Sequence, residues 1–295
     1  MISLRSRRLR RLATRRFLRR RRLVTLSLNR QEEADYPPRR ARLRPQITDA
    51  DIRLPGLPAA YDGLRIVHLS DIHHSLLVNL REVERVVELV NECSPDLVAL
   101  TGDYVTLSAA CIWPVARALG RLKAKQGVFA VLGNHDFQVG ADAITRALRA
   151  QQIQVLRNEH HALRSPAGTL WVLGVDDLWW KEADLAAAQQ GIPRGEPKLL
   201  LCHNPDIIGL ASRSGIDLVL SGHTHGGQIR LPWKWAESVY GRWNVRRRRR
   251  FVRGWGQLGG TQIYINRGIG TVWVPLRVAC PPEIACLHLR KGLPS

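Results

Sequence analysis

The sequence predicts an α/β fold in which largely parallel sheets are covered by helices. From Leu64 onward, short apolar runs rich in Val, Leu and Ile alternate with segments whose apolar residues recur at helical spacing. Alternation of this kind is typical of β-α-β units with buried strands. No internal repeat interrupts the alternation between Leu64 and His288.

The expected elements follow in order along the chain. Each expected strand is a short apolar run, and each expected helix places its apolar residues on one side. The first half of the pattern is a strand at 64–69, a helix at 80–90, a strand at 96–100, a helix at 115–122, a strand at 128–132 and a helix at 141–150. Later strands are expected at 170–175, 198–202, 216–220, 262–265 and 283–288. Ligands of such sheets bind beyond the carboxyl ends of the strands, so the residues that follow these strands are the first candidates for function.

Residues 1–46 form a separate, strongly basic segment. They contain 16 Arg and three acidic residues, a net charge of 16 − 3 = +13 out of +20 for the whole chain. Apolar residues between Ile2 and Val24 fall loosely on one side of a helical wheel, which predicts an amphipathic helix on an anionic membrane surface. A disordered basic tail explains the same composition. Prolines 37, 38 and 45 mark a linker to one large domain at 47–295.

Apolar stretches and cysteines indicate the compartment. No stretch reaches the roughly 18 apolar residues that a membrane-spanning helix needs, and the longest near-apolar run of the N-terminal segment, 23–28, contains hydroxyl groups. The five Cys are odd in number and no pair has CxxC spacing, which fits reduced thiols in the cytosol. We therefore expect a cytoplasmic protein that is neither exported nor membrane-spanning and that associates peripherally with the inner face of the membrane.

Polar side chains cluster just past the ends of five expected strands. A single His or Asp at a strand end is more often a helix cap or a satisfied polar group. Five such junctions at one sheet edge instead predict a metal site, and imidazole with carboxylate favours Mn, Fe or Zn over Ca or Mg. The residues are Asp71 and His73, Asp103, Asn134 with His135 and Asp136, His203, and His223 with His225.

The spacing of these residues is suited to two divalent ions rather than one. Asp71 and His73 are two apart on an expected extended segment, so both can turn toward one ion across a kink. Asp103 can bridge two ions through its two carboxylate oxygens. Two metals about 3.5–4 Å apart hold the attacking and the leaving oxygen of an in-line displacement at phosphorus.

The second histidine pair is flanked by glycine on both sides. His223 and His225 are two apart, between Gly222 and Gly226. We expect the two glycines to let the backbone bend, so that each imidazole reaches a different ion.

The order of these motifs resembles the calcineurin-like metallophosphoesterases, over roughly Leu64 to His288. The resemblance rests on Asp71-x-His73, Gly102-Asp103, Gly133-Asn134-His135-Asp136, His203 and Gly222-His223-x-His225. It implies a four-layer sandwich of two mixed β-sheets flanked by helices, and a dinuclear-metal phosphohydrolase. It further implies one metal held by Asp71, His73, Asp103 and His225, a second held by Asp103, Asn134, His203 and His223, and His135 as the catalytic general acid. Asp136 either orients that imidazole or caps a helix.

Further segments resemble the membrane-associated bacterial branch of the family. These are the residues 223–228, 263–270 and 280–284. That branch includes phosphodiesterases and a UDP-2,3-diacylglucosamine hydrolase of lipid A synthesis. The resemblance implies hydrolysis of a phosphodiester or pyrophosphate bond, manganese among the suitable metals, and a lipid-linked nucleotide as substrate. Some members begin with a hydrophobic anchor; we expect none here, since residues 1–46 contain no long apolar run, and electrostatic attachment is left open.

A Trp- and Arg-rich segment at 229–258 is expected to form a cap beside the metals. It contains Trp233, Trp235, Trp243 and Trp255 around the run Arg246 to Arg250. Trp233 and Arg246 are candidate substrate contacts, with indole at a lipid interface or on a nucleobase and guanidinium on phosphate. The alternative is that these Trp fill a small core and the Arg run is solvated.

Two further segments allow two interpretations each. Asn266 and Arg267 are candidate contacts to substrate phosphate, although a turn stabilised by Asn-Gly chemistry explains them nearly as well. Trp179 and Trp180 are expected to be packing residues.

Two other functions compete with a lipid-directed hydrolase. The Arg clusters could grip the backbone of a nucleic acid, which would make the chain a nuclease or nucleotide phosphodiesterase. No nucleic-acid-binding motif accompanies them. A non-catalytic metal-binding scaffold is less consistent with a sequence that keeps every ligand position and His135.

Overall fold

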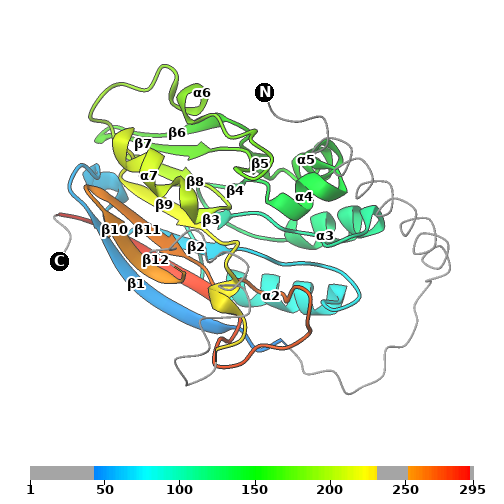
Figure 1. The fold of residues 1–295 in the computed structure, drawn as a ribbon. Helices are drawn as coiled ribbons and strands as arrows, with labels where there is room; N and C mark the ends of the chain where they lie inside the picture. Colours follow the sequence, from blue (N-terminus) through cyan, green and yellow to red (C-terminus); the bar gives the residue numbers. More distant parts are fainter. Residues whose placement is uncertain (1–42, 231–251, 293–295) are drawn as a thin grey trace, which may run out of the picture. The chain divides into compact units, whose positions relative to one another are not determined.

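Two six-stranded sheets form the centre of the fold (Figure 1). The computed structural model describes residues 43–230 and 252–292. The amphipathic helix expected before residue 43 lies outside these residues, as do Trp233, Trp235, Trp243 and Arg246 of the expected cap. The described fold belongs to the unit of the chain that begins at Leu43.

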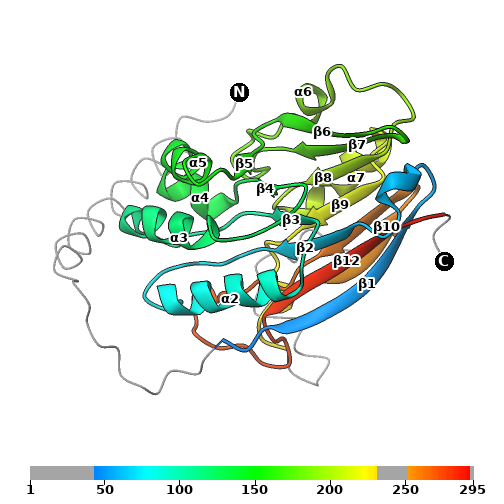
Figure 2. The same ribbon diagram turned by 180° about the vertical axis from the view of Figure 1, so that it is seen from behind.

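The first sheet has the strand order β1-β12-β2-β3-β4-β5. Its strands are β1 (Gln46–Leu54), β12 (Glu283–Lys291), β2 (Arg65–Leu69), β3 (Leu97–Leu100), β4 (Val128–Ala130) and β5 (Gln154–Val155). Strands β2 to β5 pair in parallel, whereas β12 pairs antiparallel with β2 and parallel with β1. Both views of the ribbon show β1 and β12 side by side at the edge of this sheet (Figures 1 and 2).

The second sheet has the order β10-β11-β9-β8-β7-β6. Its strands are β10 (Gly254–Leu258), β11 (Thr261–Ile265), β9 (Leu218–Ser221), β8 (Lys198–Leu201), β7 (Gly168–Gly174) and β6 (Glu159–Ser165). The four inner strands are parallel, and the two edge strands pair antiparallel with their neighbours. The mixed character of both sheets confirms the fold implied by the family resemblance.

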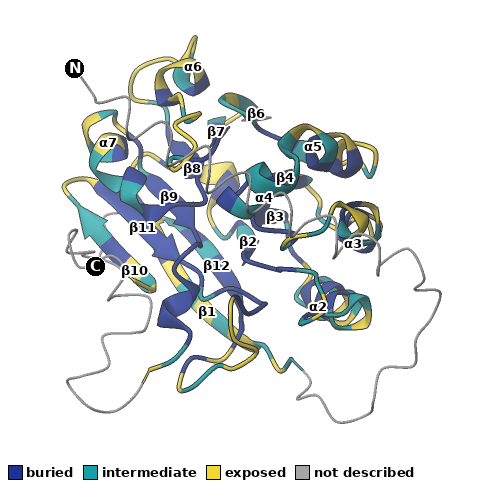
Figure 3. Ribbon diagram, turned by 45° about the vertical axis from the view of Figure 1, so that its right-hand side comes forward, coloured by how far each residue is buried: buried dark blue, intermediate teal, exposed yellow. Residues whose placement is uncertain are grey.

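Helices cover the outer face of each sheet, which completes four layers. The longer helices α2 (Leu80–Glu92), α3 (Ile112–Leu119) and α5 (Ala141–Arg149) share one apolar cluster with the first sheet. The short helices α6 (Leu185–Gln189) and α7 (Ile208–Arg213) share another with the second sheet. A third cluster fills the space between the two sheets. The buried strands lie inside and the exposed faces of the helices point outward (Figure 3).

Successive side chains of one strand divide between these clusters. Leu199 and Leu201 of β8 pack between the sheets, while Leu200 packs under the outer helices. Because side chains alternate across a strand, a strand covered on both faces must be apolar at every position. This explains why the inner strands could be predicted as continuous apolar runs.

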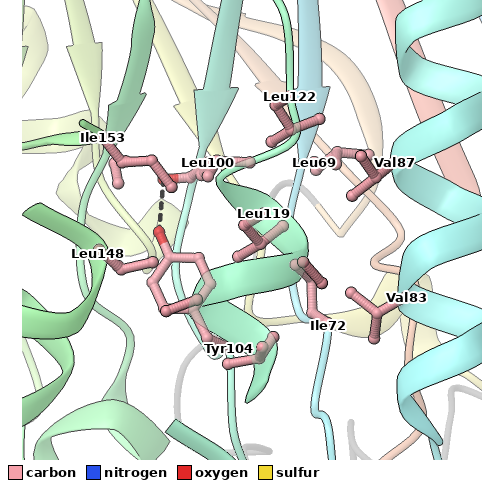
Figure 4. Packing of buried hydrophobic residues seen from close by; sticks show 14 of the residues in the cluster. Leu69, Ile72, Val83, Val87, Leu100, Tyr104, Leu119, Leu122, Leu148 and Ile153 are labelled. Carbon is pink, nitrogen blue, oxygen red and sulfur yellow. Dashed lines mark hydrogen bonds between the residues drawn. The ribbon is translucent and has the colours of Figure 1, made fainter. Parts of the chain in front are cut away.

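Figure 4 shows the cluster beneath α2 and α3, where the ring of Tyr104 packs with Leu148 and Ile153. The Tyr104 hydroxyl donates to the carbonyl oxygens of Val131 at 2.8 Å and Leu100 at 3.2 Å. Burial raises the pKa of this phenol well above its usual value, so it stays a hydrogen-bond donor. Tyr104 thereby ties the loop after β3 to the first sheet.

The main departures from the expected elements are at edges and helix starts. Four strands were not expected, namely the edge strands β1, β5, β6 and β10, and none of them is a continuous apolar run. The helix expected at 115–122 is α3, which begins at Ile112, and Pro114 lies in its first turn, where proline is tolerated. The short helices α4 (Asn134–Val139), α6 and α7 were also not expected.

Candidate metal centre

The carboxyl ends of β2, β3 and β4 in one sheet and of β8 and β9 in the other meet at one edge of the sandwich. Hydrogen bonds cross between the two sheets at this edge. The backbone N–H of His223 donates to the Asp71 carboxylate at 2.9 Å, and Nδ1 of His203 lies 2.7 Å from the carbonyl oxygen of Thr101. Side chains from five distant segments are thus fixed against one another, as the strand-end pattern predicted.

One group of side chains consists of Asp71, His73 and His225. Nε2 of His225 lies 3.2 Å and Nε2 of His73 lies 3.8 Å from Oδ1 of Asp71. The two imidazole Nε2 atoms face each other at 3.1 Å. All three side chains are buried, and their ligand atoms lie close enough together to hold one ion.

A second group surrounds Asp103. Its Oδ2 lies 3.2 Å from Nε2 of His203, and that nitrogen lies 3.2 Å from Nδ1 of His223. The Oδ1 atom of Asn134 is buried and accepts no hydrogen bond from any described residue. These donors are the four that the family resemblance implies for a second metal.

Asp103 lies between the two groups. The same Oδ2 atom that faces His203 is 3.5 Å from Nε2 of His73, while Oδ1 accepts the backbone N–H of His135 at 2.8 Å. Oδ2 of Asp103 thus faces both groups, while Oδ1 contacts the backbone. The expectation that Asp103 bridges two ions through its two oxygens stays a prediction.

These donors fit a pair of divalent cations. Nitrogen atoms of two imidazole pairs face each other at 3.1–3.2 Å beside the carboxylates. Because a neutral imidazole carries only one N–H, its other nitrogen has a lone pair, and each pair can direct lone pairs toward one cation. The buried amide oxygen of Asn134 supplies one more acceptor, and no hydrogen-bond donor within the described parts of the chain contacts it. Buried acceptors and carboxylates without cations are unfavourable, and coordination satisfies them all.

The backbone of the site is strained at five of the seven predicted metal ligands. Their φ angles are positive: Asp71 (51°), His73 (52°), Asp103 (57°), His223 (69°) and His225 (51°). Each left-handed residue costs about 1–2 kcal/mol relative to a right-handed one, although Asp and His tolerate the region better than most. The segment from Asp71 to His73 is therefore not the extended segment expected from sequence. Its two left-handed residues turn both side chains toward one point.

Gly222 has a different role from the one expected. Gly226 has a φ of 58° and does bend the backbone, but Gly222 has no positive φ. A Cβ at Gly222 would instead overlap Oγ of Ser70 and Oδ2 of Asp71. The residue is glycine because the loop after β9 passes directly against the Asp71 side chain.

Residues behind the ligands fix their orientation. Asp136 accepts the backbone N–H groups of Asp103 at 2.7 Å and of Tyr104 and Gly133 at 2.9 Å, which caps α4 and holds the Asp103 loop. These contacts support the capping interpretation, with Asp136 at the third position of α4 and Gly133 at its N-cap, while an orienting contact to His135 stays a prediction. The carbonyl of Thr101 holds a proton on Nδ1 of His203, which leaves Nε2 to face Asp103.

The buried charges of the site depend strongly on one another. Burial opposes ionisation of Asp103, but the imidazoles of His203 and His135 outweigh it and hold the carboxyl pKa below its usual range. Burial likewise opposes a charge on His203, but the Asp103 carboxylate outweighs it and raises the pKa of His203 to about 10. Without a metal, a proton on His203 therefore offsets part of the charge of the Asp103 carboxylate.

His135 lies beside the predicted metal ligands. Its ring meets that of His73 edge-on, with centroids 5.0 Å apart, and one of its nitrogens belongs to a group of ligand atoms with His73 and Asp103. Its Nδ1 is buried without a hydrogen-bond partner among the described residues. Burial lowers its pKa, since the cost of desolvation exceeds the attraction of Asp103.

Asn266 and Arg267 lie inside the protein's own hydrogen-bond network. Asn266 is fully buried; its amide donates to the carbonyl of His68 at 2.8 Å and accepts the N–H of Gly268 at 2.7 Å. Arg267 pairs with Glu283 at 3.3 Å. These contacts support the turn interpretation of the segment, and none of them leaves the Asn266 amide exposed to substrate.

Sequence reasoning missed the role of the loop after β7. Trp179 and Trp180 were expected to be packing residues, and about half of each side chain is exposed. The ring of Trp179 meets that of His223 edge-on, with centroids 4.5 Å apart, and Nε1 of Trp180 donates to the carbonyl of Asn134 at 3.1 Å. The preceding Asp176-Asp177 was the signal, since it is a further polar pair at the end of an apolar strand. Of the expected cap, Trp255 lies on β10, where its Nε1 donates to Gln262.

The chain belongs to the calcineurin-like phosphoesterase family, whose model matches residues 64–227. It is accordingly a metallophosphoesterase, with the buried His and Asp clusters that dinuclear phosphohydrolases use. Phosphodiesterase YaeI of Escherichia coli (strain K12) is 33% identical over 76% of this chain and 82% of its own length. The metallophosphoesterase YkuE of Bacillus subtilis (strain 168) is 31% identical over 83% and 85%.

Two other comparisons place these matches in context. A transmembrane protein with metallophosphoesterase domain from Danio rerio is 30% identical over 84% of this chain, which spans 58% of that relative's length. Among solved structures, the protein TT1561 of Thermus thermophilus is 15% identical over 70% of this chain and 90% of its own, with a TM-score of 0.48. The branch that contains the UDP-2,3-diacylglucosamine hydrolase stays a prediction.

Metal binding should release protons, because ligation requires the neutral form of His203. With a pKa raised to about 10, His203 is protonated at pH 7 and a cation must displace that proton. The apparent affinity for Mn²⁺ should thus rise with pH, by up to about tenfold per pH unit for one released proton. Titration calorimetry in two buffers with different heats of ionisation measures the release. His203→Ala should abolish it, and equal heats in the two buffers for the unmodified protein would contradict this account.

Proposed function

We propose that the chain is a metal-dependent phosphodiesterase that cleaves a phosphodiester or pyrophosphate bond. The observation that carries the proposal is the overlap of three buried His and Asp groups through Asp71, Asp103 and His73. Preference for a diester draws on the relative named phosphodiesterase YaeI. Manganese, iron and zinc all suit this donor set.

We assign one set of residues to binding the two cations and His135 to proton transfer. Asp71, His73, Asp103 and His225 would hold one cation, and Asp103, Asn134, His203 and His223 the other. Bound in this way, a metal pair supplies Lewis-acid charge at phosphorus and lowers the pKa of water toward neutrality. His135 lies beside His73 and Asp103, where its imidazole N–H can pass a proton to the leaving oxygen.

The effect of removing His135 should depend on the leaving group. For a phosphodiester with an alkyl leaving group, His135→Ala should lower kcat by about 10²–10⁴-fold, the usual contribution of a general acid. With p-nitrophenolate, which leaves without a proton, the loss should be much smaller. Measuring kcat for both esters with Mn²⁺-loaded protein tests this. Equal losses for the two esters would rule out proton donation by His135.

We further propose that the substrate is a lipid-linked nucleotide, with UDP-2,3-diacylglucosamine the sharpest candidate, and that the protein works at the inner face of the membrane. The basic segment 1–46 supports attachment to anionic lipid through its 16 Arg. Among the described residues, no helix is both long enough and apolar enough to cross a bilayer. We propose that attachment occurs at the surface, through charge and through apolar side chains near the site.

The loop between β11 and β12 supplies such apolar side chains. Trp273 is 81% exposed, and Val274 and Leu276 are exposed beside it. The loop starts against the metal centre, because the N–H of Gly270 donates to the carbonyl of Asp71 at 2.7 Å. Trp is favoured at the boundary between lipid and water.

This exposed Trp loop is held in place rather than loosely attached. The side-chain amide of Gln228 donates to the carbonyl oxygens of Val272 and Val274 and accepts the N–H of Val272, at 3.0–3.1 Å. The backbone of Trp273 itself has a φ of 65°, which is unfavourable for so large a residue. Strain at an exposed, fixed indole supports a binding role for the loop.

The membrane proposal predicts that the exposed Trp loop contributes to vesicle binding. The double variant Trp273→Ala with Leu276→Ala should reduce co-sedimentation with phosphatidylglycerol-containing vesicles, with about tenfold weaker partitioning from the lost apolar burial. Trp113→Ala with Leu210→Ala, exposed residues on α3 and α7, provides a matched control that should sediment like the unmodified protein. Equal vesicle binding by both double variants would show that the exposed Trp loop does not contribute to membrane attachment.

A further inference from the structure

The loop after β7 places two aromatic side chains against the half of the site that Asn134 and His223 form. Trp179 meets the ring of His223 at an angle of 86°, and Trp180 donates its indole N–H to the backbone carbonyl of Asn134. Two of the four residues predicted to hold the second metal, Asn134 and His223, thus have an indole beside them. A substrate phosphate at the metal centre would have its substituents next to this loop.

The loop is fixed at both ends. Oδ1 of Asp177 accepts the backbone N–H of Trp179 at 2.8 Å and that of Trp180 at 3.1 Å. Oδ1 of Asn158 accepts the N–H of Asp176 at 3.1 Å and that of Asp184 at 2.9 Å. The positions of the two indoles are therefore set by the protein rather than by a ligand.

The two indoles differ in their contacts and in how they could take part in binding. Trp180 stacks on Phe137, with centroids 6.1 Å apart at 23°, and the guanidinium of Arg157 lies 5.6 Å from the centre of the Phe137 ring. Trp180 is thus a positioning residue for Asn134. Trp179 contacts His223 edge-on and is 53% exposed, so a large part of its surface is open to solvent beside the metal ligands.

We propose that Trp179 is the stacking platform for a nucleobase whose phosphate lies at the metal centre. This inference rests on the proposed phosphoesterase function and names the substrate class as a nucleotide ester. A single rigid indole suits a flat ring, because base and indole stack face to face with any base identity. An acyl chain would instead need a groove lined by aliphatic side chains, whereas Trp179 stands in a loop with Asp177, Lys181 and Glu182.

Ligands that differ only in the base provide the direct test. We would measure binding of uridine 5′-monophosphate and of ribose 5-phosphate to the Mn²⁺-loaded full chain by titration calorimetry. Trp179→Ala should weaken binding of the nucleotide about tenfold, the usual effect of losing one stacked base, and leave binding of the sugar phosphate unchanged. Trp113→Ala is the matched control, since that indole is 49% exposed on α3, and it should change neither.

Two conservative variants separate stacking from general apolar contact and from misfolding. Trp179→Phe should retain most of the nucleotide affinity, while Trp179→Leu, which keeps the bulk but not the flat ring, should behave like Trp179→Ala. Rescue by Leu would overturn the proposal in favour of an aliphatic ligand. Equal weakening of both ligands by Trp179→Ala would also overturn it, since Trp179 would then act only through His223.

Failure of this inference can be told apart from failure of the proposed function. If phosphodiesters are not hydrolysed but the base-selective loss is found, the stacking platform stands and the proposed reaction falls. If phosphodiesters are hydrolysed and Trp179→Ala binds the nucleotide as well as the unmodified protein does, the proposed reaction stands and the platform falls. An unmodified protein that binds neither ligand overturns the platform.

Discussion

Two buried carboxylates, Asp71 and Asp103, must be neutralised at an edge of the sandwich where almost no solvent reaches them. The protein surrounds them with five imidazoles, contributed by His73, His135, His203, His223 and His225. A proton on His203, whose pKa the Asp103 carboxylate raises, offsets part of this charge in the apo state, and cations would offset it when the site is loaded. The fold makes this arrangement possible, because the parallel strands of both sheets end at the same edge and so bring the ligand side chains close to one another.

The strain of the backbone follows from the same constraint. Asp71 and His73 can point to one place only because both adopt left-handed conformations, and Asp103, His223 and His225 do the same on other strands. Glycines and hydrogen bonds hold these turns: the Cβ-free surface of Gly222 lets Asp71 approach, and the carboxylate of Asp136 fixes the Asp103 loop. Strain of this kind persists where the surrounding structure enforces it and is common at functional sites.

The sequence allowed the inner strands and the metal ligands to be predicted because both leave strong local signals. An inner strand such as β8 is apolar at every position after its first, and a ligand pair such as His223 and His225 stands out after an apolar run. Edge strand β1 gave no such signal, since its polar and apolar residues alternate next to Pro45. The place of Trp179 could not be predicted, because the sequence does not distinguish a buried indole from a half-exposed one; its position beside His223 appears only in the folded structure.

The most direct test of the account is the number of metal ions that Asp103 controls. Because Oδ2 of Asp103 lies between His73 and His203, its loss should disrupt both halves of the site. Protein reconstituted with Mn²⁺ and freed of excess metal should contain about two ions per chain by mass spectrometry of the elements, and Asp103→Ala should contain well under one. A folded Asp103→Ala protein that retains both ions, or an unmodified protein that binds none, would contradict the account.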